Sequence, residues 1–259
     1  MSRLQTTAAM MLLAARTAGA FTHAAAAGRA TALRSIGTVV EGAEGTESYR
    51  QFFTDDSGAK ISPWHDISLR PGGDAKVFNM VTEIPKYGTA KMEVDTKGES
   101  NPIMQDIKKG ALRFYHGPIF WNYGCLPQTW EDPNAKHPEL QCFGDDDPID
   151  VVEIGSSALA AGSVTPVKAL GVLAMIDDGE LDWKVLAIAE SDPLAATLND
   201  VADVEAQCPG VVSGIREWFR WYKTPDDKPI NADSSTLEQH TVFECKYCST
   251  VQARASKKS

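Results

Sequence analysis

The chain lacks the features that mark several large classes of protein. None of its apolar runs approaches the roughly 20 residues that a membrane-spanning helix requires. Its five cysteines are odd in number and scattered, which argues against a disulfide framework. Internal repeats and glycine-rich phosphate loops of the Walker type are missing as well. The 259 residues therefore predict one substantial globular domain behind a separate N-terminal segment.

Positive charge is also scarce. The sequence holds 25 lysines and arginines against 35 aspartates and glutamates, which gives a net charge of −10. This balance argues against nucleic acid or an anionic membrane as the partner of the mature protein. A strongly acidic protein can still bind a highly charged anion when metal ions mediate the contact.

The N-terminal segment contains no acidic residue before Glu41. A short apolar stretch, residues 8–15, is followed by the small residues Ala-Gly-Ala at 18–20 and then by Phe21. This order of features is typical of targeting sequences and resembles the bipartite plastid presequence of algae with secondary plastids. We predict that residues 1–46 are a presequence removed on import into a plastid. A mitochondrion is the second choice, and a secretory or uninformative leader the third.

One cysteine pair near the C-terminus has the spacing of a metal or redox site. Cys245 and Cys248 are separated by two residues, and His240 lies a few residues before them. Structural zinc sites use four ligands, and these residues supply three at most. The pair therefore predicts no metal site by itself.

The segment "FGDDDPIDVVEIG", residues 143–155, concentrates like charges in one turn. Asp145, Asp147 and Asp150 repel one another, which raises carboxylate pKa values unless a cation lies between them. In an extended chain Asp150 would face away from the other two. Pro148 favours a bend that brings all three together ahead of a buried strand.

Two other interpretations of these acids can be tested on the sequence. In an EF-hand loop that starts at Asp145, the sixth and twelfth positions should be Gly and Glu, but they are Asp150 and Ser156. The EF-hand is therefore excluded. A solvated acidic turn fits the spacing as well as a metal site does.

Strand patterns fill the first two thirds of the chain beyond the N-terminal segment, and helix patterns follow. Residues 49–53, 76–84, 89–94, 168–176 and 183–189 have apolar or alternating sequences typical of strands. We expect one helix over residues 191–210, capped by Asp192, and a second over residues 211–225. Strands before helices predict a barrel or sandwich with helices packed on one side.

The hairpin turn Asp178-Gly179 is expected to bring a second pair of acids together. Asp177 and Asp182 lie at the two ends of this tight connection, and Lys184 shares a face with Asp182. Lys91 and Glu93 likewise share one face of the strand at 89–94. A second acid pair in addition to the first three favours a site for several metals over a solvated turn.

Six motifs, in order along the chain, resemble those of the soluble family I inorganic pyrophosphatases. They are "EIPKYGTAKMEV", "NPIMQDIKKGALRF", "WNYGCLPQTWEDP", "DDDPIDV", "DDGELDWKV" and "EWFRWYKTPDDKP". The resemblance covers residues 47–231 and is greatest to the eukaryotic branch, with "FYHGPIFWNYG" most like the plastid enzymes. It implies a mainly β fold: a five-stranded OB-like β-barrel with flanking helices, mostly C-terminal.

The resemblance implies hydrolysis of pyrophosphate to two phosphates by direct attack of a water, with several Mg²⁺ ions per site and a monomer or homodimer. The implied metal ligands are Asp145, Asp150, Asp182, Asp177 and Glu93, and Asp147 would be the general base. The implied phosphate ligands are Arg113, Lys184, Tyr222 and Lys223, with Lys91 and Tyr123 beside them and Glu83 as a supporting residue. Alternatives are a less selective nucleotide or polyphosphate phosphohydrolase and an inactive OB-fold binding module.

Three departures from the family pattern bear on these expectations. Ile119 stands where many relatives have a phosphate-contacting tyrosine, which shifts the expected role to Tyr123. Lys86 stands where arginine is frequent, an exchange that keeps the charge. Residues 232–259 no longer resemble the family, so we predict a divergent C-terminal tail there.

Overall fold

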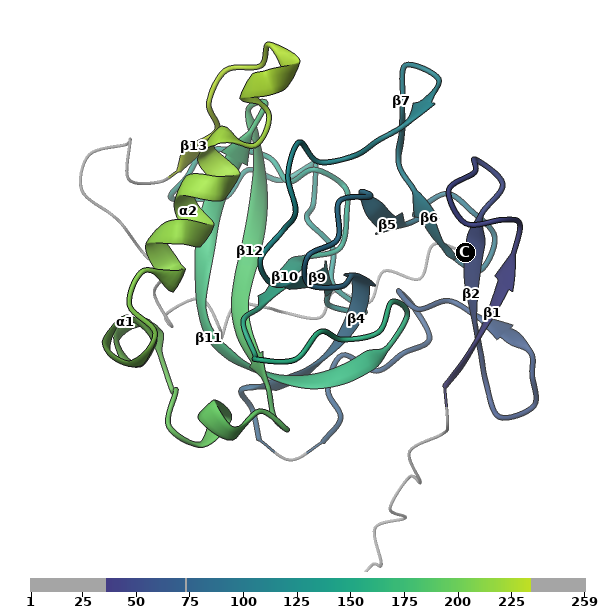
Figure 1. Ribbon diagram of the computed structural model, residues 1–259, viewed down its shortest axis with the longest axis horizontal. Helices are drawn as coiled ribbons and strands as arrows, with labels where there is room; N and C mark the ends of the chain where they lie inside the picture. The colour runs from purple at the N-terminus through teal and green to yellow at the C-terminus, as the bar shows by residue number, and fades with distance from the viewer. Residues whose placement is uncertain (1–35, 73, 234–259) are drawn as a thin grey trace, which may run out of the picture. The chain divides into compact units, whose positions relative to one another are not determined.

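The computed structural model describes residues 36–72 and 74–233, in which strands dominate and helices follow in the C-terminal third (Figure 1). The strands are β1 (Gly37–Glu41), β2 (Arg50–Thr54), β3 (Lys60–Ile61), β4 (Val77–Ile84), β5 (Met92–Val94), β6 (Ile103–Gln105), β7 (Ile107–Lys108), β8 (Ala111–Leu112), β9 (Asn122–Cys125), β10 (Asp150–Glu153), β11 (Val164–Asp177), β12 (Glu180–Ala189) and β13 (Ala232–Asp233). The helices are η1 (Pro193–Ala196), α1 (Val201–Gln207), α2 (Val211–Trp221) and η2 (Thr224–Asp226), of which η1 and η2 are 3₁₀. The predicted order of strands and then helices is confirmed.

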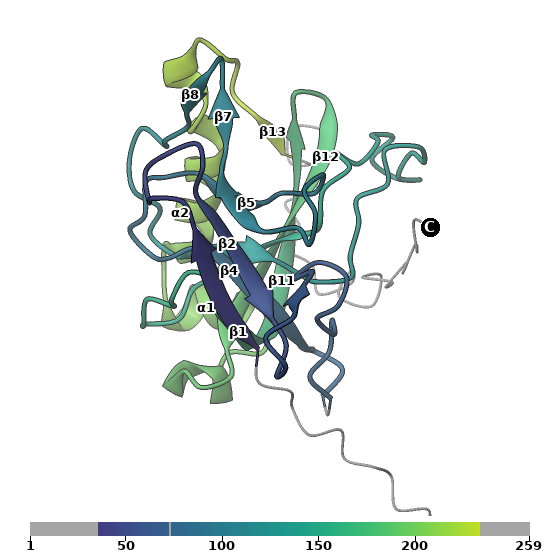
Figure 2. The same ribbon diagram turned by 90° about the vertical axis from the view of Figure 1, so that its right-hand side faces the viewer.

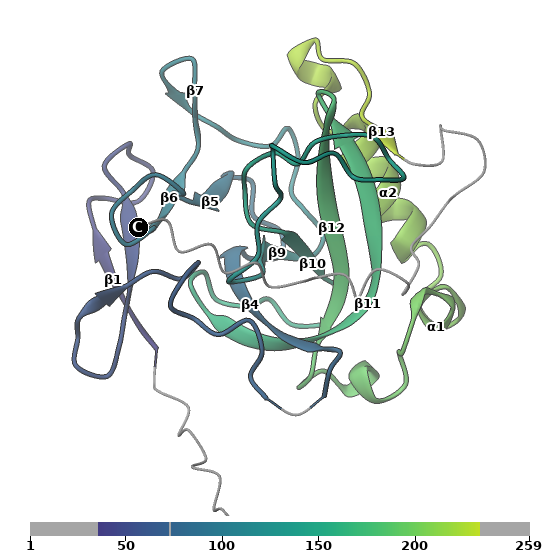
Figure 3. The same ribbon diagram turned by 180° about the vertical axis from the view of Figure 1, so that it is seen from behind.

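Five strands close into a barrel in the order β12, β10, β9, β4 and β11, because β11 also pairs with β12. The 14-residue strand β11 makes the closure possible. Its first residues pair with β4, and the rest pair with β12 across a register irregularity between Ala169 and Gly171. Figure 3 shows β11 and β12 curving together around the barrel. The predicted five-stranded OB-like barrel is confirmed.

A second sheet lies beside the barrel, with strand order β1, β2, β6 and β5, and with β3 paired to β2 (Figure 2). Its outer strand β1 pairs with β2 in an antiparallel register from Gly37 to Glu41. All five side chains of β1 are exposed, so no apolar alternation in the sequence marks it as a strand. Paired structure thus starts inside the stretch assigned to the presequence.

The region predicted as one helix over residues 191–210 forms two, and this prediction is wrong. Asp192 caps η1 as expected, since its side chain accepts a hydrogen bond from the Leu194 N–H at 2.9 Å. A second cap interrupts the helix: Asp200 has extended backbone angles and accepts from the Asp203 N–H at 3.0 Å. A cap of this kind satisfies the free N–H groups of a new first turn, so α1 starts there.

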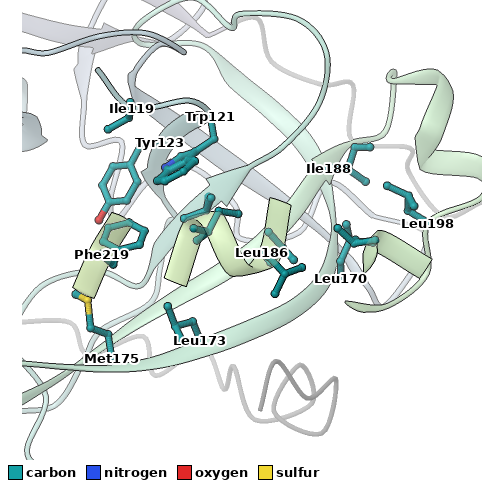
Figure 4. Close-up of a cluster of buried hydrophobic side chains, with 14 of the residues drawn as sticks. Ile119, Trp121, Tyr123, Leu170, Leu173, Met175, Leu186, Ile188, Leu198 and Phe219 are labelled. Atoms are coloured by element: carbon teal, nitrogen blue, oxygen red, sulfur yellow. The ribbon is translucent and has the colours of Figure 1, made fainter. Parts of the chain in front are cut away.

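Helix α2 packs its apolar face on the barrel, as its pattern predicts. Val212, Ile215 and Phe219 are buried in the largest hydrophobic cluster, together with side chains of β9, β11 and β12. In Figure 4 the Phe219 ring lies beside Tyr123, with centroids 6.1 Å apart. Burial of each such side chain stabilises the fold by about 1.5–3 kcal/mol. This packing fixes where the end of α2 meets the barrel.

No helix in the described residues is both long enough and apolar enough to span a membrane.

Candidate active site

A cavity of about 480 Å³ opens among the barrel strands, β5 and the end of α2, and all of the predicted site residues line it. The acids are Glu83, Glu93, Asp145, Asp147, Asp150, Asp177 and Asp182, and the other residues are Lys91, Arg113, Tyr123, Lys184, Tyr222 and Lys223. The structure therefore brings together side chains from every motif that the sequence singled out. Their individual roles remain predictions.

The loop before β10 carries Asp145 and Asp147, and backbone contacts with Glu131 fix its path. The Asp146 N–H donates to the Glu131 carbonyl at 3.0 Å, and the Glu131 N–H donates to the Asp147 carbonyl at 2.9 Å. Gly144 permits this approach, since a Cβ there would overlap the Glu131 backbone. Asp146 takes a left-handed φ of 73°, which turns the chain between the two cavity acids.

Strand pairing places the remaining acids beside Lys184. Asp150 of β10 lies opposite Lys184 in a parallel register, and Asp182 lies opposite Met175 in the antiparallel hairpin. Residues opposite each other share a face of the sheet, so Asp182 shares a face with Met175 and therefore with Asp177, two residues further along β11. Both acids line the cavity. The predicted hairpin and its shared face are confirmed.

Four of the five cationic side chains that line the cavity contact a carboxylate. Lys184 forms ion pairs with both Asp150 and Asp182, and Lys223 forms one with Asp177. The Lys184 pairs link β10 with β12, and the Lys223 pair links β11 with the segment after α2. A ligand that uses the cations must displace the carboxylates or share the cations with them.

The second group of cations shares an acid that the sequence analysis missed. Lys91 pairs with Glu93 and lies 3.2 Å from Asp106, and Arg113 donates to Asp106 at 2.9 Å. Asp106 lies inside one of the six motifs, but its sequence position gives no sign that it holds two cations. Only the folded chain shows it. The Asp106 N–H donates to the Lys91 carbonyl, and the Asp106 carbonyl accepts from the Arg113 N–H.

Several cavity carboxyls are held away from their ordinary protonation. Burial first, and then the charges of Asp150 and other acids, raise the pKa of Asp145 and of Asp147 to about 6. Burial raises the pKa of Asp182 to about 7 against the opposing effect of Lys184. Burial and the Asp150 charge raise the pKa of Glu83 well above its ordinary value. These are the shifts expected where carboxylates are buried close to one another.

The tyrosines of the cavity differ in how their hydroxyls are used. The Tyr123 hydroxyl donates to Asp150, and the Tyr222 hydroxyl donates to Asp177 at 3.1 Å. Ile119 is buried in the core and offers no polar atom. A third tyrosine, Tyr115, also lines the cavity, and the sequence analysis missed it.

One group of carboxylates fits a divalent cation directly. Oxygens of Glu131, Asp145 and Asp182 all lie within 4.8 Å of one another. Glu131 accepts from the Trp183 N–H with one oxygen, and its other oxygen is buried with no hydrogen-bond partner in the part of the chain that the structure describes. Hard cations such as Mg²⁺ prefer such oxygen ligands. Glu131 was not predicted, although it lies in the motif "WNYGCLPQTWEDP".

Comparisons with known proteins agree with this geometry. The family model described as inorganic pyrophosphatase matches residues 80–248. The chain is 55% identical over 192 residues to soluble inorganic pyrophosphatase 6, chloroplastic, of Arabidopsis thaliana, covering 74% of this chain and 63% of that protein. It is 49% identical over 199 residues to an inorganic pyrophosphatase of Drosophila melanogaster, covering 75% of this chain and 59% of that one. The chain thus spans less than two thirds of these two relatives.

A solved structure supports the same assignment. The crystal structure of type I inorganic pyrophosphatase from Toxoplasma gondii matches with a TM-score of 0.73 and 55% identity, covering 77% of this chain and 88% of that one. An inorganic pyrophosphatase from Schistosoma japonicum matches with a TM-score of 0.74 and 46% identity, covering 76% and 71%. The family match, the barrel and the carboxylate cavity agree, and the chain belongs to the inorganic pyrophosphatase family.

Proposed function

We propose that the protein hydrolyses inorganic pyrophosphate to two phosphates with Mg²⁺ as its cofactor. The observation that carries this proposal is one cavity lined by nine carboxylates and five cationic side chains. Carboxylates at this density hold divalent cations, while lysines and an arginine bind phosphate oxygens. A substrate that is both highly charged and small fits such a combination.

The predicted ligands of the tightest metal are Asp145, Asp150 and Asp182, and the position of Glu131 adds a fourth candidate. Asp177 would join Asp182 in holding a further ion, and Glu93 another. When bound, Mg²⁺ neutralises the charges of the phosphates and lowers the pKa of a coordinated water. Burial first, and then repulsion between the acids, raises the pKa values of this cluster, and a bound cation would offset both effects.

Asp147 is the proposed general base. It lines the cavity, and it has no ion-pair partner among the described residues, so its carboxylate is free to accept a proton from the attacking water. A base works best when its pKa lies near the working pH, and burial raises that of Asp147 to about 6. At neutral pH the group is therefore mostly ionised but still a competent proton acceptor.

The phosphates of the substrate would be held by Arg113, Lys184, Tyr222 and Lys223. Lys184 and Lys223 contact acids that are themselves proposed metal ligands. Binding of substrate would transfer the lysines from carboxylate to phosphate oxygens and free the carboxylates for cations. Cationic side chains at these positions then stabilise the charge that develops on the leaving phosphate.

Phosphate release from pyrophosphate and from ATP, each with and without Mg²⁺, tests the proposed activity. We expect Mg²⁺-dependent release from pyrophosphate and much slower release from ATP. Equal hydrolysis of the two substrates would support a less selective phosphohydrolase. If the protein binds pyrophosphate and ATP but releases phosphate from neither, the result would support a binding module.

We also propose a plastid as the site of action. The Arabidopsis relative is named chloroplastic, and the acid-free composition before Glu41 is that of a targeting segment. Residues 1–35 lie outside the described part of the chain. Because β1 begins at Gly37 and is paired, a cleavage site before Gly37 is preferred to one at residue 46.

A fusion of the first 45 or so residues to a fluorescent protein, expressed in an alga with secondary plastids, tests the localisation. The fusion should reach the plastid, and Phe21→Ala should divert it. Mitochondrial fluorescence from the unchanged fusion would overturn the assignment.

A further inference from the structure

Three tyrosines line the cavity, and one of them has an unused hydroxyl. Tyr123 donates to Asp150 and Tyr222 donates to Asp177, so each of these hydroxyls has a carboxylate partner in the structure. Tyr115 also lines the cavity, yet its hydroxyl makes no hydrogen bond within residues 36–72 and 74–233. A phenol hydroxyl in a polar cavity normally has a partner, since an unmade hydrogen bond costs free energy.

The ring of Tyr115 is held firmly in place. It contacts Trp218 edge to face at a centroid distance of 5.1 Å and an interplanar angle of 76°, and Tyr222 at 6.0 Å and 65°. Its backbone N–H donates to the Thr89 carbonyl at 2.7 Å. The ring is held by the segment that contains Tyr115 and by helix α2, and both belong to the packed domain. The hydroxyl therefore needs little further ordering to meet a ligand.

The surroundings of this hydroxyl are mostly cationic. The charges of Lys91, Lys184 and Arg113 act on it, and one nearby acid, Asp150, acts in the opposite direction. Asp150 already accepts from Tyr123 and contacts Lys184. A polyanion drawn to these cations would thus come within reach of a free O–H donor. Burial raises the pKa of Tyr115 to about 12, so the hydroxyl keeps its proton at neutral pH.

We propose that Tyr115 is a substrate-binding residue whose hydroxyl donates a hydrogen bond to a phosphate oxygen of pyrophosphate. The inference rests on the proposed function and adds Tyr115, in place of Tyr123, to the tyrosine contact already proposed for Tyr222. The Tyr123 hydroxyl then serves the protein by holding Asp150, which is a positioning role.

The test compares Tyr115→Phe with the unchanged protein and with Tyr87→Phe. Phenylalanine keeps the ring that packs against Trp218 and removes only the hydroxyl. Tyr87 is 65% exposed and lies outside the cavity, so its variant is the matched control. Imidodiphosphate, which is not hydrolysed at its bridging nitrogen, serves as the probe, and calorimetry in Mg²⁺ measures its affinity. A titration of Mg²⁺ alone and the melting temperature complete the set.

Loss of one charge-assisted hydrogen bond should weaken imidodiphosphate binding by Tyr115→Phe roughly tenfold and raise KM for pyrophosphate to match. Mg²⁺ affinity without the probe should stay within about twofold, and Tyr87→Phe should behave as the unchanged protein. Affinity equal to that of the unchanged protein in Tyr115→Phe would overturn the inference while leaving the proposed function intact. Failure of the unchanged protein to bind imidodiphosphate or hydrolyse pyrophosphate would overturn both.

A second measurement uses only the unchanged protein, so it does not depend on whether Tyr115→Phe folds. If Tyr115→Phe melts well below the unchanged protein, ¹³C NMR of the unchanged protein with tyrosine labelled at Cζ decides the matter. The chain has six tyrosines, so the signals can be resolved and assigned. A shift of the Tyr115 signal on addition of imidodiphosphate supports the contact, and an unmoved signal contradicts it.

Discussion

The two sides of the cavity treat charge in opposite ways. On the cationic side, Lys91, Arg113, Lys184 and Lys223 each form an ion pair with a carboxylate of the protein. On the acidic side, Asp145, Asp147 and Glu131 have no such partner among the described residues, and their pKa values are raised. These four cations are neutralised within the protein, whereas the three acids have no cationic partner in the part of the chain that the structure describes.

This difference distinguishes the unpaired acids from Asp150, Asp177 and Asp182, which are also proposed metal ligands but are paired with lysines. Paired cations remain ionised at any pH the protein meets, so they are ready for a phosphate whenever it displaces a carboxylate. Unpaired acids lose their protons as the pH rises, and the ionised carboxylates then bind divalent cations more tightly. We therefore predict that a bound cation offsets the repulsion among the aspartates of this turn.

The largest effect is expected from Asp147, the proposed general base. Asp147→Asn keeps the shape of the side chain but cannot accept a proton, so kcat should fall by roughly 10²-fold or more. Added Mg²⁺ should not restore activity, because the lost group is not a proposed metal ligand. Steady-state rates over a range of Mg²⁺ concentrations measure both points.

Asp150, which is paired with Lys184, should respond differently. Asp150→Asn removes a charge from a proposed metal ligand, so the apparent Mg²⁺ affinity should drop and excess Mg²⁺ should recover part of the activity. The same titration serves both variants. Rescue of Asp147→Asn by Mg²⁺, with no response from Asp150→Asn, would show that the two roles are reversed.

A smaller effect should follow from removing a paired cation. Lys223→Met should raise KM for pyrophosphate roughly tenfold, since a charge-assisted contact to phosphate is lost. Lys228 offers the control: it forms an exposed ion pair with Asp178 at 3.1 Å and lies outside the cavity. Lys228→Met should leave KM within about twofold, as expected of a surface pair. Equal effects of the two substitutions would argue against a substrate contact for Lys223.

The acidic side should also make the metal-free protein sensitive to pH. Asp145 and Asp147, with a pKa of about 6, and Asp182, at about 7, bind a proton more tightly when folded than when unfolded. The folded state therefore holds more protons between about pH 4 and about pH 7, and stability falls as the pH rises through that window. In EDTA the melting temperature should drop by roughly 5 °C or more between the two limits.

Saturating Mg²⁺ provides the control for this prediction. A cation that binds only the folded protein stabilises it, and it does so most where the carboxylates are ionised. The fall in melting temperature should therefore largely disappear in Mg²⁺. A fall of the same size with and without Mg²⁺ would place the responsible groups outside the cavity.

The smallest effect concerns the C-terminus. Asn231 is buried and donates to the Phe219 carbonyl at 3.1 Å, and β13 then pairs two residues with β11. A chain that ends at Asp233 should keep its activity and lose little in melting temperature. A chain that ends at Pro229 should melt lower, since it lacks Asn231. Aggregation of the longer form would show that residues beyond Asp233 pack on the domain, consistent with the family match that continues to residue 248.

Short-range patterns predicted the elements that carry their own signal. The apolar runs of β4, β11 and β12 and the spacing of Val212, Ile215 and Phe219 in α2 are visible in the sequence because burial dictates them. The strand β1 has only exposed side chains, and the cap at Asp200 competes with a helical pattern that continues through it. The sequence analysis therefore missed both the strand β1 and the helix boundary at Asp200.

The site divides in the same way. Spacing alone left a metal site and a solvated turn undecided for Asp145, Asp147 and Asp150. Strand and hairpin patterns then added Asp177, Asp182 and Lys184, and the resemblance to a family added Arg113, Tyr222 and Lys223. Asp106 and Tyr115 could not be singled out, because their importance depends on which side chains of other segments surround them. Glu131 is similar, since its free oxygen becomes evident only when the loop at Gly144 is folded against it.

The strand register at the cavity has a consequence for the order of folding. Val81 pairs with Val164, and Asp150 pairs with Lys184, so the cavity forms only after distant segments of the chain have met. Non-local pairings of this kind form slowly, because the loops between them must close first. A cation held by those acids stabilises contacts that early folding species lack. Mg²⁺ should therefore slow unfolding far more than it speeds folding, and stopped-flow rates in both directions measure the difference.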